Sequence, residues 1–265
     1  MTIVFAIANQ KGGVGKTTTS VNLAASLGLM NRQVLLIDLD PQGNATMGSG
    51  MEKKELPHSV YDVLIGEKSA EESLVKAEAA GYDIIGANSD LIGAEIELLD
   101  LDRREYRLKD ALLNFGGKYD FIVLDCPPAL GVLTLNGLVA SDSVIVPMQC
   151  EYYALEGLTA LLDTIDRISS SLNPKLKVEG LLRTMYDPRN SLSRDVSLHL
   201  IDHFGDAVYR TIVPKNVRLA EAPSYGVPVH FFDKYSKGSR AYLALAGEVL
   251  NRHPEAADKV DDDGE

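Results

Sequence analysis

The first thirty residues constrain the fold more than any other stretch of the chain. Residues 2–8 form a β-branched apolar run, which leads into the glycine-rich stretch "NQKGGVGKTT" from Asn9 to Thr18. A helical pattern follows to about residue 30, with Leu23 and Leu27 on its expected buried face. A buried strand, a glycine-rich turn and a helix, in this order, are typical of a loop that binds phosphate through its backbone N–H groups.

This loop ends as a P-loop ends, but it does not begin as one. Gly15, Lys16 and Thr17 have the G-K-T order, whereas Gln10 stands where the pattern G-x-x-x-x-G-K-[ST] has its first glycine. Lys11 is a second lysine, and a nucleotide can be held without it. A glycine-rich turn without a ligand is the alternative interpretation, and the G-K-T ending argues against it.

We expect the loop and the first helical turn to hold the phosphates of ATP. Lys16 is expected to reach the β- and γ-phosphates, and the Thr17 hydroxyl is expected to bind Mg²⁺. The helix N-terminus adds partial positive charge. The residues expected to bind the nucleotide here are Gly12, Gly13, Val14, Gly15, Lys16, Thr17 and Thr18.

Short apolar runs alternate with helical patterns along the rest of the chain. The runs are "QVLLID", "YDII", "YDFIVLD", "SVIVPM" and "KVEGLLRTMY", and the helical patterns include "REYRLKDALLNF" and "ALEGLTALLDTIDRIS". Runs with little polar alternation indicate strands buried on both faces, which means a parallel sheet covered by helices. We therefore predict an α/β fold with one domain, residues 1–253, and an acidic, disordered tail, residues 254–265.

Acidic residues follow two of these strands. Asp38 and Asp40 lie in "IDLDPQGN" and would point to the same side of an extended chain. Asp125 ends the run "FIVLD", as in a Walker B strand whose acid holds a Mg²⁺-bound water. Each motif alone is weakly specific, and "IDLDPQGN" alone reads as an ordinary turn. Together with the loop they predict a nucleotide and magnesium site at the carboxyl edge of the sheet.

Bulk composition narrows the class of protein. The two cysteines, Cys126 and Cys150, have no metal-ligand spacing and are expected to be reduced structural thiols. No apolar run reaches the roughly 20 residues that span a bilayer. The net charge of −12 argues against nucleic acid as a partner, yet residues 183–240 hold nine basic and six acidic residues. A local basic face is therefore possible.

These motifs carry a family resemblance over residues 2 to about 250. "KGGVGKTT" resembles the deviant Walker A motif, "DLDPQGN" the Walker A′ motif and "VLDCPP" the Walker B motif; "MQCEYYALEGL" and "VPKNVRLAEAPSYG" also resemble stretches of ParA/Soj partition ATPases. The chain is identified as a ParA/Soj-type member of the ParA/MinD superfamily. The resemblance implies a mostly parallel, twisted sheet of seven or eight strands with helices on both faces, and a homodimer closed around two ATP molecules.

The resemblance also implies roles for single residues. Lys11 would cross the dimer interface to the partner's phosphates, and Asp40 would position the attacking water, so that Lys11, Lys16 and Asp40 form the catalytic set. Asp38 and Asp125 would hold Mg²⁺-bound waters beside Thr17. Between residues 184 and 216 we expect the adenine pocket, with Pro214 and Asn216 as its contacts. The alternative for "VPKN" is a plain surface turn.

Members of this family bind nonspecific DNA as ATP dimers and release it on ATP hydrolysis, which a ParB-type centromere-binding protein stimulates. By resemblance Arg189 and Arg218 carry DNA binding here, with Lys215 beside them, and Lys234, Lys237 and Arg240 could add phosphate contacts. The sequence shows no signal for base readout, so phosphate contacts alone are expected. The expected location is cytoplasmic and nucleoid-associated, and the cargo is a chromosome or plasmid.

Three rival functions share this ATPase core. A MinD-like membrane switch needs a basic amphipathic helix near its C-terminus, whereas this sequence ends "HPEAADKVDDDGE". An iron–sulfur reductase needs cysteines facing the dimer axis, and the spacing of Cys126 and Cys150 does not favour that. A small-molecule kinase or ligase needs a substrate pocket that the sequence does not reveal. We therefore expect no membrane partner.

Overall fold

A single eight-stranded sheet forms the centre of the protein, in the order β3-β4-β2-β5-β1-β6-β7-β8. The structure is a computed structural model that describes residues 2–254, so nearly all of the predicted tail lies outside the described residues. All strand pairs are parallel except β3 with β4. The strands are β1 Ile3–Ile7, β2 Val34–Asp38, β3 Val75–Ala77, β4 Tyr82–Ile85, β5 Phe121–Asp125, β6 Ser143–Gln149, β7 Lys177–Tyr186 and β8 Val208–Pro214.

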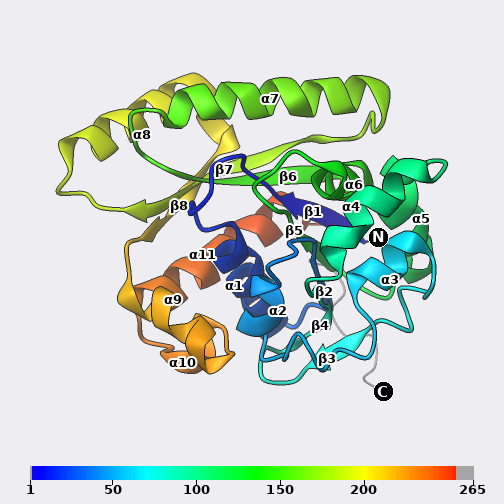
Figure 1. The fold of residues 1–265 in the computed structure, drawn as a ribbon. Helices are drawn as coiled ribbons and strands as arrows, with labels where there is room; N and C mark the ends of the chain where they lie inside the picture. Colours follow the sequence, from blue (N-terminus) through cyan, green and yellow to red (C-terminus); the bar gives the residue numbers. More distant parts are fainter. Residues whose placement is uncertain (1, 255–265) are drawn as a thin grey trace, which may run out of the picture.

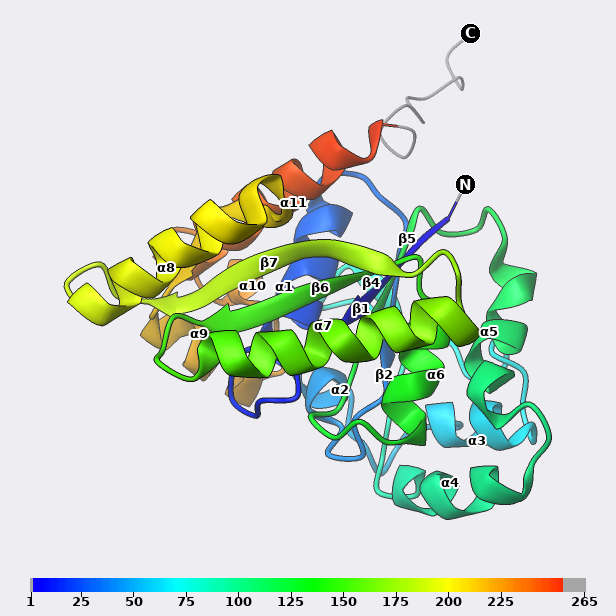
Figure 2. The ribbon, with the colours of Figure 1, turned by 90° about the horizontal axis from the view of Figure 1, so that it is seen from above.

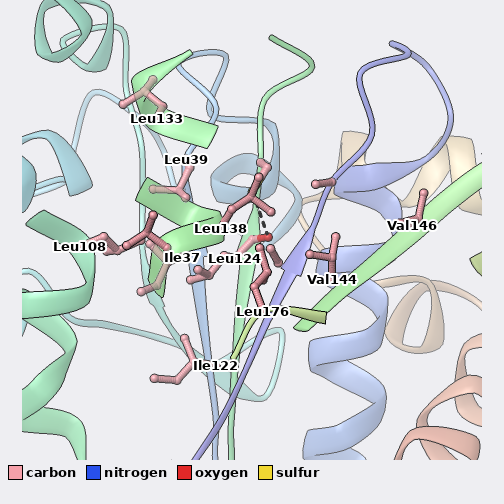
Figure 3. Close-up of a cluster of buried hydrophobic side chains, with 14 of the residues drawn as sticks. Ile37, Leu39, Leu108, Ile122, Leu124, Leu133, Leu138, Val144, Val146 and Leu176 are labelled. Atoms are coloured by element: carbon pink, nitrogen blue, oxygen red, sulfur yellow. Dashed lines mark hydrogen bonds between the residues drawn. The ribbon is translucent and has the colours of Figure 1, made fainter. Parts of the chain in front are cut away.

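The central strands are buried on both faces, and alternate side chains enter two separate apolar clusters. Leu35, Ile37 and Leu124 belong to one cluster, part of which Figure 3 shows. Leu36 and Val123, their neighbours in sequence, belong to the other. Successive side chains of a strand point to opposite faces of the sheet, so a strand that is apolar at every position contributes to a core on each face.

Helices cover both faces of the sheet, as Figure 1 shows. Helices α3 to α8 contribute to the first cluster, and α1, α2 and α9 to α11 contribute to the second. The helices are α1 Lys16–Leu29, α2 Asn44–Gly48, α3 Val60–Ile65, α4 Leu91–Glu97, α5 Arg107–Leu112, α6 Val132–Ala140, α7 Ala154–Ser171, α8 Ser191–Phe204, α9 Val217–Glu221, α10 Val229–Phe232 and α11 Lys237–Arg252. The 3₁₀ segments within residues 2–254 are η1 Leu98–Asp100, η2 Arg104–Tyr106, η3 Leu113–Phe115, η4 Gly205–Ala207 and η5 Ala222–Tyr225.

The predicted fold class is confirmed: the fold is α/β, with one mostly parallel sheet between two helical layers. Strand register places the three sequence motifs side by side, at the C-terminal ends of β1, β5 and β2. Asp125, the last residue of β5, is paired with Ile7 of β1 on one side and with Asp38 of β2 on the other. The glycine-rich loop leaves β1 directly after Ile7, so it begins beside both carboxylates.

Candidate nucleotide-binding site

The glycine-rich loop connects β1 to α1 and presents unpaired N–H groups. Gly13 and Gly15 have φ of +72° and +88°, which an L side chain adopts only with strain. Within residues 2–254, no hydrogen bond uses the N–H groups of Gly12, Gly13, Val14 or Gly15. Four such donors at a helix N-terminus form a ready site for an anion.

Neighbouring strands hold the carbonyl groups of the same loop. The Thr184 hydroxyl at the end of β7 donates to the carbonyl of Val14 at 2.7 Å. The Gln149 amide at the end of β6 donates to the carbonyl of Gly13 at 3.1 Å. These contacts bind the carbonyl side of the loop to the sheet, so the N–H side remains available to a ligand.

Lys16 begins α1, and its side chain folds back under the loop. Its Nζ donates to the carbonyl of Lys11 at 3.2 Å, and the residue is buried. Burial lowers the pKa of Lys16, while the carboxylate of Asp125 opposes that shift. A desolvated ammonium beneath unpaired N–H groups increases the positive potential of the loop.

Asp38 and Asp125 are both fully buried, but their oxygens differ in hydrogen bonding. Both Asp38 oxygens are occupied: Oδ1 accepts from the N–H of Asp40 at 3.1 Å, and Oδ2 accepts from the N–H and hydroxyl of Thr46 at 2.8 and 2.7 Å. Asp125 Oδ1 accepts from the Ser20 hydroxyl at 2.8 Å, whereas the buried Oδ2 has no hydrogen-bond partner among residues 2–254.

This pair of carboxylates is costly to keep ionised without a cation. Burial raises the pKa of Asp38, and burial together with the nearby charge of Asp38 raises the pKa of Asp125. A hydrated divalent cation would supply both the charge and the donor that Asp125 Oδ2 lacks. The donor set therefore fits magnesium bound through water, with the Thr17 hydroxyl near by at the start of α1.

Asp40 and Lys11 lie at the entrance to the site. Asp40 is half-exposed, and its Oδ1 accepts from the N–H of Gln42 at 3.0 Å. Its charge is close enough to Lys16 to affect the pKa of that ammonium. Lys11 is exposed, and its ammonium forms an ion pair with Glu151, which follows β6. In this chain Lys11 is therefore held by its own protomer, beside the loop.

An apolar cavity of about 280 Å³ adjoins the loop. Gly15 and Thr18 line it, and so do Pro214 and Asn216. Asn216 Oδ1 is buried and has no hydrogen-bond partner among the described residues. An apolar slot with one unpaired acceptor suits a flat base that carries an amino group.

Comparisons with known proteins agree with this geometry. Residues 2–178 match the sequence model of a family described as "AAA domain". The chromosome partitioning protein ParA of Caulobacter vibrioides is 52% identical over 251 residues, which are 94% of either chain. The sporulation initiation inhibitor protein Soj of Bacillus subtilis is 50% identical over 246 residues, 93% of this chain and 97% of Soj. This chain belongs to the ParA/Soj family of chromosome-partitioning ATPases.

A solved structure with the same fold extends the comparison. A protein titled cobyrinic acid a,c-diamide synthase, from Mycobacterium smegmatis with bound ADP and magnesium, has a TM-score of 0.84 and 43% identity, and each chain covers 98% of the other. The ParA/Soj chain described here therefore shares its whole fold with a protein crystallised with a nucleotide and magnesium.

The basic residues expected at DNA lie on the side of the sheet where β7 and β8 end. Arg189, almost fully exposed, is paired with Asp187 at 2.7 Å. Arg218 on α9 is paired with Glu221 at 2.7 Å and with Asp233 at 3.4 Å. Lys215 is exposed and also lines the apolar cavity. Both arginines of this ParA/Soj protein are therefore paired internally.

Several residues that build the site were missed from the sequence. They act through tertiary hydrogen bonds, and spacing gives no signal for Thr46 or Ser20, which hold the two buried carboxylates. Glu151 gave a weak signal, as an acid next to a strand end. The missed residues are Ser20, Thr46, Gln149 and Glu151.

The remaining expectations concern cysteines and membranes. Cys126 and Cys150 are both buried free thiols, and burial raises the pKa of each. Within the part of the chain that the structure describes, no helix has the length and apolar character needed to cross a bilayer.

Proposed function

We propose that this protein is an ATP-driven partition protein whose ATP-bound dimer binds DNA without sequence preference. ATP hydrolysis, stimulated by a ParB-type partner, would release the DNA and so move a chromosome or plasmid. The observation that carries the proposal is the loop whose four N–H groups have no partner within residues 2–254, beside an oxygen of Asp125 that also has none there. We place the ATPase domain at residues 1–253, the acidic tail at residues 254–265, and the protein on the nucleoid in the cytoplasm.

In the proposed mechanism, the residues of one protomer bind and orient ATP. The loop N–H groups and Lys16 bind the phosphates, and Thr18 contributes from the first turn of α1. Thr17, Asp38 and Asp125 would hold magnesium, Thr17 through its hydroxyl and the carboxylates through bound water. Magnesium neutralises phosphate charge as the γ-phosphoryl group is transferred.

Asp40 positions the attacking water in this proposal. Its side chain lies at the entrance, where the γ-phosphate of a loop-bound nucleotide would end, and among the described residues one hydrogen bond, from the N–H of Gln42, restrains it. An Asp40→Ala variant is therefore expected to bind ATP and dimerise but hydrolyse slowly. Normal turnover by this variant would remove Asp40 from the mechanism.

Lys11 links hydrolysis to dimerisation. In the dimer its ammonium would leave Glu151 and reach the partner's phosphates, where it stabilises the charge that develops during transfer. The ion pair with Glu151 lies at the surface, so separating it costs little. Lys11→Ala should therefore keep ATP binding by the monomer and lose dimerisation, whereas Lys16→Ala should lose ATP binding itself. If Lys11→Ala and Lys16→Ala reduced ATP affinity equally, the proposal that Lys16 binds ATP and Lys11 acts across the dimer would be contradicted.

The adenine ring is proposed to occupy the cavity beside the loop. Pro214 supplies an apolar wall, and Asn216 Oδ1 would accept a hydrogen bond from the amino group of adenine. This contact would satisfy a buried acceptor, whose lack of a partner costs about 1–3 kcal/mol.

DNA binding is proposed for Arg189, Lys215 and Arg218. Three contacts per protomer become six in a dimer, and log K falls with log[salt] by about 0.9 per contact. A dimer could thus retain DNA at a salt concentration where a monomer does not. Because Arg189 and Arg218 are paired internally, each must exchange a carboxylate for a phosphate, and Asp187 and Glu221 would lower the affinity.

DNA co-sedimentation with ATP, with ADP and without nucleotide tests the proposal. Retention only with ATP supports it, and retention independent of nucleotide refutes the switch. Arg218→Glu should abolish retention while ATP-dependent dimerisation persists. The matched control is Arg167→Glu. Arg167 is exposed on α7 and has no ion pair within residues 2–254, so this variant should retain DNA as the natural protein does. If both the Arg218→Glu and the Arg167→Glu variants lost DNA retention, the effect would come from net charge and not from a contact made by Arg218.

A second candidate function is a small-molecule ligase. The observation that favours it is the 43% identical structure whose title names cobyrinic acid a,c-diamide synthase. A ligase would consume ATP in proportion to an amidated or phosphorylated metabolite, without stimulation by DNA. ATP turnover measured with DNA and with carboxylic acid metabolites separates the two functions.

A further inference from the structure

Helix α4 and the η1 turn that follows it are apolar on two sides. Leu91, Ala94 and Leu98 are fully buried in the core. The other side carries Ile92, Ile96 and Leu99, whose exposed fractions are 56%, 70% and 56%. Packing against the core explains the apolar character of the three buried residues but not that of the three exposed ones. The second set, which we call the α4 stripe, follows the spacing of one continuous helix face.

Acidic residues border the α4 stripe. At about 100° per residue along α4, Glu95 lies beside the stripe, and Glu97, whose carboxylate accepts from the Tyr61 hydroxyl, lies farther round the helix. Asp100 follows in the 3₁₀ turn η1. The segment from Asp90 to Asp102 contains five acidic residues and no basic one. Among residues 2–254, none of these five carboxylates takes part in an ion pair.

The nearest basic residues in the sequence do not neutralise this border. The side chain of Arg103 is paired with Asp110, and that of Arg104 is paired with Glu105. Figure 2 shows α4 at the margin of the molecule, away from α8 and α11. The stripe is therefore an exposed apolar surface with a strongly negative rim.

We propose that the α4 stripe docks a basic amphipathic helix of another protein. Ile92, Ile96 and Leu99 would contact its apolar face, and the carboxylates would pair with lysine or arginine on its flanks. A second copy of this chain is a poor occupant, because a symmetric contact would bring the same acidic rims together. An anionic membrane is a poor occupant for the same reason.

Two contacts connect α4 to the nucleotide site. Glu95 Oε1 lies 2.9 Å from the position that a Cβ on Gly131 would occupy, and Gly131 ends the loop that follows Asp125. The N–H of Ala87, just before α4, donates to the Thr46 hydroxyl at 2.9 Å, and that hydroxyl donates to Asp38. A partner that shifts α4 would therefore disturb the hydrogen bonds that support the Asp38 carboxylate and the loop that follows Asp125. This link to ATP turnover rests on the proposed function, whereas docking itself does not.

The test uses a fluorescent 14-residue Leu/Lys peptide that forms an amphipathic helix, with a Leu/Glu peptide of the same pattern as control. Anisotropy should show binding of the Leu/Lys peptide only. The double variant Ile92→Ser, Ile96→Ser should bind it about tenfold more weakly. The matched double variant Leu198→Ser, Ile201→Ser, at exposed positions of α8, should bind it as the natural chain does.

Equal affinity of the two double variants would overturn the proposal, because binding would then depend on charge alone. Binding of the Leu/Glu peptide with similar affinity would overturn it as well. If sedimentation shows that the Ile92, Ile96 variant has lost self-association, the occupant is a second copy and the proposal is wrong. Hydrogen exchange of residues 126–131 should slow when the Leu/Lys peptide binds, even if the protein proves to have no ATPase activity.

Discussion

The hydroxyl of Thr46 gives the sharpest test of how the site is built. It is fully buried, donates to Asp38 Oδ2 at 2.7 Å, and accepts from the N–H of Ala87 at 2.9 Å. Thr46→Val keeps the shape of the side chain and removes both bonds. The variant leaves a buried N–H unpaired, at a cost of about 1–3 kcal/mol, and removes a bond to a carboxylate worth about 1.5–3 kcal/mol.

The second of these terms depends on pH. Burial raises the pKa of Asp38 to about 6, and the hydrogen bond from Thr46 opposes that rise. A carboxyl whose pKa is higher in the folded state than in the unfolded state makes stability fall as pH increases between the two values. Because Thr46→Val raises the folded pKa further, its loss of stability should grow from about 1–3 kcal/mol near pH 5 to about 2.5–6 kcal/mol near pH 8.

Urea unfolding at these two pH values, without nucleotide, measures the effect. Thr46→Ser is the matched control, because it keeps the hydroxyl and loses only a methyl group, at a cost of about 1 kcal/mol at either pH. The reasoning is refuted if the difference in unfolding free energy between the Val and Ser variants is the same at both pH values.

Three further predictions concern single contacts. Asn216→Leu should leave the unfolding free energy unchanged or higher, because it removes an unpaired buried acceptor. The same variant should bind ATP more weakly, with a smaller effect on GTP. An unaltered preference for ATP over GTP in a binding assay would exclude Asn216 from base recognition. Glu151→Gln should strengthen ATP-dependent dimerisation by up to about thirtyfold, since each of the two protomers separates a surface pair with Lys11 worth at most about 1 kcal/mol; weaker dimerisation in sedimentation would show that Glu151 acts otherwise. Ser20→Ala should lower stability by about 1–3 kcal/mol, and added magnesium and ATP should restore part of that loss; a melting temperature equal to that of the natural chain would show that Asp125 does not need the hydroxyl.

The sequence was informative wherever local chemistry determines structure. The run that ends in Asp125 is apolar because β5 is central, and the predicted strand ended at the correct residue. β7 was predicted with its observed bounds for the same reason. The short strand β3 and the edge strand β8 were not predicted, because half-exposed strands lack a continuous apolar run.

The contacts between distant residues could not be predicted. Asp38 and Thr46 are eight residues apart, and a helix must begin between them before the hydroxyl can reach the carboxylate. The ion pair between Lys11 and Glu151 depends on β1 and β6 lying side by side. The resemblance suggested a role for Lys11 across a dimer, but it gave no partner for that lysine within its own chain.

The distribution of unpaired groups separates the parts of the site that maintain the fold from the parts that await a ligand. Asp38 has partners at both oxygens, so its first role is to hold the turn before α2. Among residues 2–254, Asp125 Oδ2, Asn216 Oδ1 and the N–H groups of residues 12–15 have none. Tyr209 and Arg183 also carry unpaired buried atoms away from the loop, so a deficit alone does not define a site. At the loop, donors suited to phosphate, an oxygen suited to a hydrated cation and an acceptor suited to an amino group occur together. ATP with magnesium would satisfy all three, and each buried group that it satisfies would return about 1–3 kcal/mol to the folded state.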